Sequence, residues 1–489
     1  MVFFPVVVLV YWLMPQKIRY IWLLLASYYF YMSWNAKYAL LIAFSTLVTY
    51  LSGLALERIK QSNGPTSRKK LVVAASFIVN LGILVFFKYS DFLLHNLNAV
   101  LSHLSIQAVS SPFDIVLPVG ISFYTFQALG YTVDVYRDEI PAEKNILKYA
   151  LFVSFFPQLV AGPIERSKNL LTQIDQIIYK KTPPPHIYAG LLTMLWGLFL
   201  KMVIADRAAI LVNTVFDQYY LYGTTELLAG ALAFSLQIYC DFASYSTIAI
   251  GAAQVMGFAL MENFNTPYFA VSIKDFWRRW HISLSTWFRD YLYIPLGGSH
   301  CSKLRTYFNT MVTFLVSGLW HGASWHFVAW GGLHGAYQIA EAELQPLAQR
   351  FHQRFHVKTE CFSYHFGRQL RTCLLVAFAW IFFRADGLLN ALAYIQRLFM
   401  RWNPWTLFDG SLYTLGLDRF EMNIFLVSLL ALFLVDLLKY RKAWVFSSFL
   451  LEQNAWFRWL CLVGLLISIV IYGQYGPGFE PQAFIYFQF

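Results

Sequence analysis

Long apolar stretches separated by short polar connections are the main pattern along this chain. Each stretch predicts a helix, because unpaired backbone groups are too costly in lipid and a span needs about 20 apolar residues. Several stretches are short or interrupted by Gly and Pro, which predicts broken or re-entrant helices among the spanning ones. The stretches lie at 2–15, 20–34, 38–56, 71–88, 113–133, 146–163, 187–204, 226–258, 306–341, 372–384, 423–438 and 456–473.

Composition places the chain in the membrane class. Of its 489 residues 58% are hydrophobic and only 13% are charged, whereas ordinary globular domains are about 45–50% apolar. The fold class predicted is therefore all-α, a polytopic membrane protein. No internal repeat or second domain is visible, so residues 1–489 are expected to form a single membrane-embedded domain.

The charges indicate orientation. Lys17, Arg19 and the basic connection 57–70 follow the first and third stretches, which predicts cytoplasmic connections and an external N-terminus. Basic residues at 439–442 precede the last stretch and send the C-terminus outside as well. The net charge of +11 is explained by retention against an anionic lipid leaflet, and no nucleic-acid partner is expected. The polar stretch 341–371 is interpreted as a surface connection.

His321 lies inside an apolar run at 313–335 (TFLVSGLWHGASWHFVAWGGLHG), which also contains His326 and His334. An ionisable group at such depth usually faces a cavity and serves a function. A lone buried histidine is more often satisfied by one helix carbonyl. Glycines and tryptophans around this one favour a shaped pocket with His321 as general base; they are Gly318, Gly322, Gly331, Gly332, Trp320 and Trp325.

A metal site is not expected in this run. His326 and His334 do not share a helical face with His321, and no HExxH motif is present. Two or three histidines without a common face do not form the ligand set of a zinc site.

The segment 272–291 (SIKDFWRRWHISLSTWFRDY) predicts one amphipathic helix. Its polar face carries Lys274, Arg278, His281, Ser285 and Arg289 within an arc of roughly 80°, opposite an aromatic face. Two interpretations remain open. The helix is an interfacial anchor with its aromatic face in lipid, or its basic face docks a phosphate-rich donor such as a coenzyme A thioester.

Two further features carry candidate chemistry. Asp241 lies in an otherwise apolar span, where it either orients a histidine or closes a polar seam between helices. The chain ends in the aromatic hexapeptide 484–489 (FIYFQF), which is an aggregation hazard if exposed and is therefore expected to be tucked into the protein. It is either a plug of packed rings or a carrier of the nucleophile Tyr486.

Five blocks together resemble the membrane-bound O-acyltransferase (MBOAT) family, in the bacterial branch that includes alginate acetylation proteins and, more distantly, the teichoic acid D-alanylation protein. They lie between 110 and 335, and the tail adds another match. Ser244 and Thr247 depart from the alginate-type pattern, so the resemblance does not assign alginate as the acceptor. The blocks are LPVGISFYTFQ at 117–127, FFPQLVAGPIER at 155–166, YCDFASYS at 239–246, DFWRRWHISLSTWFRDYLYIPLGG at 275–298 and SGLWHG at 317–322.

The resemblance implies a ring of about 10–12 transmembrane helices around a thin centre, with a central tunnel. It implies that His321 is catalytic, that His281 supports activity and that Tyr486 carries the acyl group. Lys274, Arg278, Arg289, Trp320, Trp325 and Asp241 are then expected to bind the donor. The donor implied is acyl-CoA, most simply acetyl-CoA, and no bound cofactor is expected.

The reaction implied is O-acylation of an extracytoplasmic polysaccharide or cell-wall polymer, at a bacterial cytoplasmic membrane. An external SGNH or serine hydrolase-like acyltransferase is the expected partner, and membrane lipids surround the chain. Two alternatives stay open. One is direct acylation of a lipid or secreted protein, which would not need the tail, and the other is a transporter or polymer-export channel.

Overall fold

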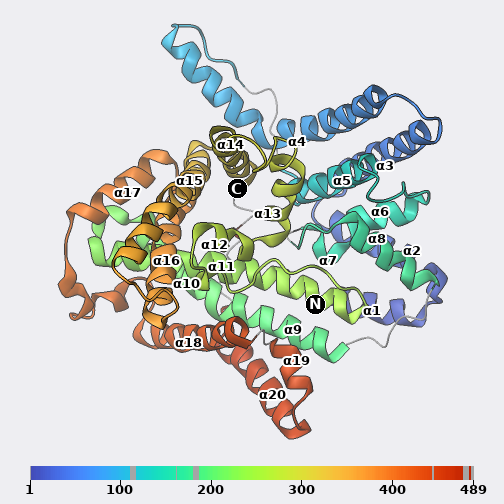
Figure 1. Cartoon of the computed structure of the whole chain (residues 1–489). Coiled ribbons are helices and arrows are strands. Elements are labelled where there is room, and N and C mark those ends of the chain that lie inside the picture. The colour runs from blue at the N-terminus through green and yellow to red at the C-terminus, as the bar shows by residue number, and fades with distance from the viewer. Residues whose placement is uncertain are drawn as a thin grey trace. The chain divides into compact units, whose positions relative to one another are not determined.

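The structure of the chain is a computed structural model, and it describes residues 2–110, 117–160, 162–179, 187–442, 445–476 and 484–485. These residues form helices, turns and loops, with no β-strand among them (Figure 1). The predicted all-α membrane class is therefore confirmed. Contacts divide the chain into two compact units, residues 1–191 with 249–261, and residues 192–248 with 262–489. The prediction of a single functional domain remains a prediction.

The first unit contains helices of very different length. Short helices follow one another around residue 155, where the extended Phe155 separates α6 from α7, so the predicted broken helix in the stretch 146–163 is confirmed. The helices are α1 (Phe3–Leu13), α2 (Arg19–Met32), α3 (Ala39–Gln61), α4 (Thr66–His103), α5 (Ile121–Tyr136), α6 (Ile146–Ser154), α7 (Phe156–Leu159) and α8 (Ser167–Tyr179), with the 3₁₀ turns η1 (Gln16–Ile18) and η2 (Ala36–Tyr38).

Small and hydroxylated side chains join α3 to its neighbours in this unit. Ser45 Oγ lies 2.5 Å from Asn80 Oδ1 of α4, and Tyr149 of α6 donates to Thr49 Oγ1 at 2.7 Å. All four side chains are buried. Such hydrogen bonds hold apolar helices together where the hydrophobic effect between helices is weak.

The second unit holds the candidate site. Two of its turns are π-helical, η3 (Leu200–Ala205) and η6 (Arg289–Tyr293). Helices α9 (Ile187–Phe199) and α11 (Thr224–Val255) lie largely in this unit. The others are α10 (Asp206–Asp217), α12 (Ile273–Arg279), α13 (Ile282–Phe288), α14 (Lys303–His321), α15 (Trp325–Arg354), α16 (Phe362–Arg384), α17 (Leu388–Met400), α18 (Arg419–Lys442), α19 (Phe446–Leu451) and α20 (Ala455–Tyr472), with 3₁₀ turns η4 (Tyr219–Leu221), η5 (Pro267–Phe269), η7 (Pro404–Leu407) and η8 (Ser411–Thr414).

Seven helical segments among the described residues are long and apolar enough to cross a membrane, and α1 is a shorter apolar helix. This number supports a polytopic protein. The predicted ring of 10–12 helices, its thin centre and tunnel, and the external termini remain predictions. The seven segments are Ala36–Gln61, Thr66–His103, Ile187–Asp217, Thr224–Val255, Phe362–Arg384, Arg419–Arg441 and Ala455–Tyr472.

The chain around residue 340 is helical on both sides of one break. The apolar stretch 306–341 forms two helices, as expected for a stretch interrupted by Gly, because Gly322 and Ser324 adopt extended backbone angles and turn the chain between α14 and α15. The expected surface connection at 341–371 is largely exposed, and it is mostly helical. Residues 341–354 continue α15, and α16 begins at residue 362, since a polar helix is stable when it continues a packed one.

Helices α14 and α15 pack against each other as a hairpin (Figure 1). At Gly318 an added Cβ would meet the Phe327 carbonyl oxygen, and at Gly331 it would meet the Phe314 carbonyl oxygen. The predicted close backbone approach at these two glycines is confirmed. At Gly332 the added Cβ would make only an ordinary contact, 3.6 Å from Leu315 Cδ2.

Candidate functional site

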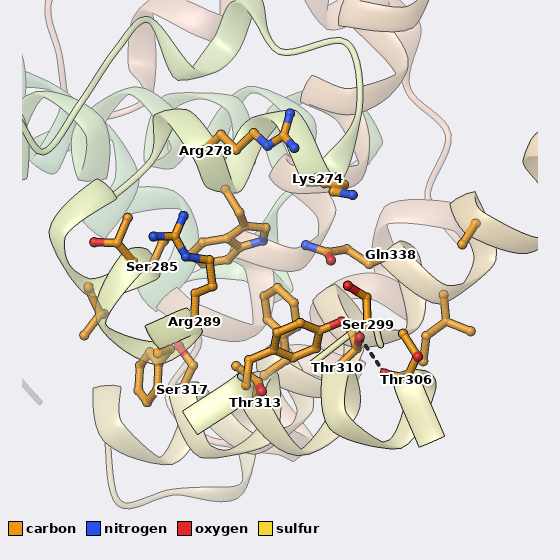
Figure 2. Close-up of a pocket in the computed structure, with 18 of the residues that line it drawn as sticks. Lys274, Arg278, Ser285, Arg289, Ser299, Thr306, Thr310, Thr313, Ser317 and Gln338 are labelled. Carbon is orange, nitrogen blue, oxygen red and sulfur yellow. Dashed lines mark hydrogen bonds between the residues drawn. The ribbon is translucent and has the colours of Figure 1, made fainter. Parts of the chain in front are cut away.

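A pocket of about 670 Å³ lies in the second unit between α12, α13, η6, α14 and α15 (Figure 2). Lys274, Arg278 and Arg289 line it, as expected for donor-binding residues, and among the described residues no Asp or Glu belongs to the lining. The structure therefore brings together three of the six predicted donor-binding residues. Helix α12 presents two of them, and it begins after Ser272, whose Oγ accepts a hydrogen bond from the Asp275 N–H at 3.0 Å.

The charge of this pocket is positive. Arg289 Nε donates to Asp290 Oδ1 at 2.7 Å, whereas no carboxylate in the described part of the chain forms an ion pair with Lys274 or Arg278. Nearby, hydrogen bonds from Lys303 and Tyr307 lower the pKa of Glu343, which keeps that carboxylate ionised and engaged with Lys303. Unpaired guanidinium and ammonium groups beside a hollow of this size suit phosphate groups.

Hydroxyl groups follow one face of α14 from the pocket towards His321. Thr306, Thr310, Thr313 and Ser317 all line the pocket, and Figure 2 shows them along the same helix. Their spacings of four, three and four residues place them on one helical face, and His321 is four residues beyond Ser317. This stripe was not predicted from the sequence. It gives α14 a polar path that ends at the histidine.

His321 is the last residue of α14 and is 4% exposed. Three rings surround its imidazole, with centroid distances of 5.0 Å to Trp320, 5.0 Å to Trp330 and 5.3 Å to Phe383. It is not part of the pocket lining. The aromatic walls restrict the ring and exclude bulk water, which suits a general base reached by a reacting group from one direction.

The predicted amphipathic helix 272–291 is wrong. The chain breaks at His281, which has the left-handed angles φ +42° and ψ +55° and separates α12 from α13. Asn263 fixes the break. Its carbonyl oxygen accepts the Ile282 N–H at 2.9 Å, and its Oδ1 accepts the Ser283 hydroxyl at 2.6 Å. His281 is fully buried and does not share the exposed basic face of Lys274 and Arg278.

The aromatic face of this segment packs inside the protein rather than entering lipid, so the interfacial-anchor interpretation is wrong for these rings. Phe276 and Trp280 are each 1% exposed and stack at 5.4 Å, and Trp280 also lies 5.1 Å from Trp380 of α16. Burial of rings of this size is the main stabilisation available to such short helices. The basic side chains remain exposed because the segment is anchored from its other side.

Trp320 and Trp325 do not form the expected pair. Trp320 is 4% exposed and lies between the two histidines, with centroid distances of 6.1 Å to His281 and 5.0 Å to His321. Trp325 is 55% exposed at the start of α15. Neither lines the pocket.

Asp241 contacts neither the pocket nor a histidine. Its Oδ1 lies 2.7 Å from Lys201 Nζ, and its Oδ2 accepts the Ile485 N–H at 2.8 Å. Asp241 therefore closes a polar seam between helices rather than orienting a histidine. Lys201 was missed, although an ionisable residue in the apolar stretch 187–204 was a signal of the same kind as His321.

The described part of the C-terminal tail is buried, as expected. Phe484 is 8% and Ile485 is 2% exposed, and Phe484 lies 5.1 Å from Tyr245 and 6.0 Å from Phe242. Phe242 in turn lies 4.5 Å from His281. Tyr486 lies outside the described residues, so its predicted role remains a prediction.

His334 is buried and packs against the rings of Trp277 and Trp330. Trp277, which lines the pocket, donates from Nε1 to His334 Nδ1 at 3.2 Å. Among the described residues, no group of three or more His, Cys, Asp or Glu is arranged to hold a metal ion. The hydrogen bond instead fixes the orientation of the Trp277 ring in the pocket wall.

The helical fold, the buried histidines and the cationic pocket agree with the sequence comparison. Residues 7–377 match the model of the MBOAT, membrane-bound O-acyltransferase family, and the chain belongs to this family. It is therefore an O-acyltransferase.

Several curated proteins are similar to this chain. The "Probable alginate O-acetylase AlgI" of Pseudomonas aeruginosa is 39% identical over 402 residues, which cover 81% of this chain and 73% of that protein. The "Peptidoglycan O-acetyltransferase" of Helicobacter pylori is 35% identical over 404 residues, 77% and 73% of the two chains. The "Teichoic acid D-alanyltransferase" of Bacillus subtilis is 30% identical over 236 residues, 46% and 58% of the two.

Proposed function

We propose that this chain takes an acetyl group from cytosolic acetyl-CoA, loads it on Tyr486 and so presents it outside a bacterial cytoplasmic membrane for O-acetylation of a polysaccharide or wall polymer. The relatives named for alginate, peptidoglycan and teichoic acid support a polymer acceptor, and the O-acetylase and the O-acetyltransferase among them support an acetyl group. A serine hydrolase-like partner is proposed for the last transfer.

The observation that carries the proposal is the position of the tail. Phe484 packs on Phe242, Phe242 contacts His281, and Trp320 lies between His281 and His321. The tail is thus linked to His321 by a short series of ring contacts within one unit. The cationic pocket extends along the hydroxyl stripe of α14 to within four residues of His321.

The proposed step balances without a further reactant. The Tyr486 oxygen attacks the thioester carbonyl carbon, a C–O bond forms, and the C–S bond breaks. His321 accepts the phenolic proton and returns it to the departing thiolate. A neutral imidazole can accept a proton from a hydroxyl, and the ester of a phenol is itself a good acyl donor because phenolate is a good leaving group.

The second step regenerates the tyrosine. A hydroxyl of the polymer, activated by the partner, displaces Tyr486 from the aryl ester, so the thioester's transfer potential is used outside the membrane without ATP. Lys274, Arg278 and Arg289 are proposed to hold donor phosphates, because charge-assisted contacts from such groups are the strong ones.

Cells that produce defined variants test this function. His321→Ala and deletion of residues 484–489 are each expected to abolish polymer O-acetylation while leaving the amount of membrane-inserted protein unchanged. His365→Ala, an exposed histidine on α16, is the matched control and should acylate normally. Acylation at the wild-type level in His321→Ala would refute the proposal, and normal acylation after the tail deletion alone would refute the relay and favour direct transfer.

A further inference from the structure

A buried ion cluster joins η3, α10 and α11. Lys201 Nζ lies 2.7 Å from Asp241 Oδ1 and 2.9 Å from Asp206 Oδ1. Asp241 is 3% and Asp206 is 4% exposed. The Lys201 side chain is 25% exposed, whereas both carboxylates are buried. Carboxylates at such depth are costly and usually kept for a function.

The cluster lies where the chain departs from regular α-helix. Lys201 belongs to the π-helical turn η3, between α9 and α10, and π-turns inside helices occur frequently at functional sites. The next residue, Met202, accepts the backbone N–H of Gln474 at 2.9 Å through its carbonyl oxygen. The chain that follows α20 is therefore attached to the same turn that carries the lysine.

Asp241 makes a second attachment. The Asp241 Oδ1 forms an ion pair with Lys201, while the Asp241 Oδ2 accepts the Ile485 N–H at 2.8 Å. The neighbouring residues Phe242 and Tyr245 on α11 pack on the Phe484 ring. One segment of α11 thus offers a carboxylate to the tail backbone and two rings to its side chain.

We infer that Lys201 and Asp241 form a clamp that positions the C-terminal tail for acyl loading. The inference rests on the proposed function, since it assumes that the residue after Ile485, Tyr486, receives the acyl group. Lys201 orients the Asp241 carboxylate, and Asp206 holds the ammonium from a second side. The clamp contacts the backbone of the tail, so it limits where the following tyrosine can reach without occupying any tail side chain.

A pair of variants at one position tests the clamp without altering the buried cluster. Ile485→Pro removes the N–H that Asp241 accepts, because proline has none. Ile485→Ala keeps that N–H and removes only apolar contact. In the full-length protein with labelled acetyl-CoA, loading of the C-terminal peptide by Ile485→Pro should be at least tenfold slower than by Ile485→Ala, as expected for the loss of a charge-assisted hydrogen bond.

The Michaelis constant for acetyl-CoA should be the same in both variants, because neither Ile485 nor Asp241 lines the donor pocket. Equal loading rates in the two variants would overturn the clamp while leaving the acyl-tyrosine relay intact. A change confined to the Michaelis constant would also overturn it, since a positioning residue acts on the rate of loading.

Hydrogen exchange separates the clamp from the proposed function. The Ile485 amide of the full-length wild type, without donor, should exchange slowly, and Asp241→Ala should accelerate it at least tenfold while α11 amides stay protected. Equal protection of Ile485 in both proteins would overturn the clamp whether or not an acyl-tyrosine forms. If Asp241→Ala also accelerates exchange of the α11 amides, the comparison of Ile485→Pro with Ile485→Ala decides whether the clamp exists, because those two variants leave Lys201, Asp206 and Asp241 unchanged.

Discussion

Lys274 and Arg278 lie one turn apart on α12, and both line the pocket with no carboxylate of the described chain in an ion pair with either. Arg289, in contrast, shares its charge with Asp290. At the scale of single residues, the first two side chains are therefore the groups most available to a phosphate. Their exposure also makes their attraction sensitive to ionic strength.

We expect Lys274→Gln and Arg278→Gln each to raise the Michaelis constant for acetyl-CoA about three- to tenfold, with a smaller change in the rate of loading. The reason is the loss of one charge-assisted phosphate contact in a solvent-exposed place, worth about 1 kcal/mol. Added salt should shrink the difference from wild type. Steady-state loading at several salt concentrations measures both effects.

Arg350→Gln is the control for these two variants, because Arg350 is exposed on α15 and does not line the pocket. It should behave as wild type. A donor site elsewhere is indicated if Lys274→Gln and Arg278→Gln also behave as wild type.

Single residues were predicted with uneven success, and the reasons are local. Lys274, Arg278 and Arg289 could be grouped from their spacing, because the cations on both sides of the break still line one pocket. The burial of His281 could not be predicted. His281 adopts a left-handed backbone conformation, but neither it nor the preceding Trp280 is a Gly or Pro that would have indicated a break in the helix. The contact between Asp241 and Ile485 joins residues 244 positions apart, which no local pattern encodes.

The α14–α15 hairpin is the element that connects the pocket to His321. Its two helices approach closely at Gly318 and Gly331, and the turn at 322–324 leaves His321 at the end of α14. Ser317 is 6% exposed and is the pocket-lining residue nearest to His321 in sequence. Packing of the hairpin and the path along it can be tested separately.

Gly318→Ala should destabilise the protein by about 1–3 kcal/mol, because the new methyl group would meet the Phe327 carbonyl oxygen and force the helices apart. Gly332→Ala should be neutral or stabilising, since its methyl group has space and alanine favours helix. Thermal unfolding in detergent compares the two. Equal melting temperatures would contradict the close approach of α14 and α15.

Ser317→Leu should slow acyl loading about tenfold or more, because a larger side chain fills the pocket wall one turn before His321. Val316→Leu is the matched control, since Val316 is 38% exposed and is not part of the pocket lining. Rates of loading at saturating donor compare the two. Loading by Ser317→Leu at the rate of the control would show that the reacting acyl group does not pass this face of α14.

Elements were predicted well where hydropathy alone decides and poorly where packing decides. The apolar stretch 226–258 corresponds to α11 at Thr224–Val255. A break within the stretch 306–341 could be expected from its glycines, but its position at 322–324 could not, because small residues also occur inside membrane helices. The polarity of 341–354 indicated an exposed surface segment but not its helical form, because exposed polar residues also continue a helix that is anchored at its other end.

The family match extends over residues 7–377 and therefore over parts of both compact units. At the scale of the whole molecule, membrane class and family could be predicted from composition and from five ordered motifs. The number of membrane crossings could not be predicted from composition. Seven segments of the described residues are long and apolar enough to cross a membrane, and α14 and α15 are not among them.

The claim that Tyr486 carries the acetyl group can be checked by intact-mass analysis of the full-length protein with labelled acetyl-CoA. The relay predicts one added acetyl group, labile to hydroxylamine and located on the C-terminal peptide. The adduct should be absent from His321→Ala and from Tyr486→Phe. An adduct that persists in Tyr486→Phe, or polymer acetylation that proceeds without any C-terminal adduct, would contradict the claim.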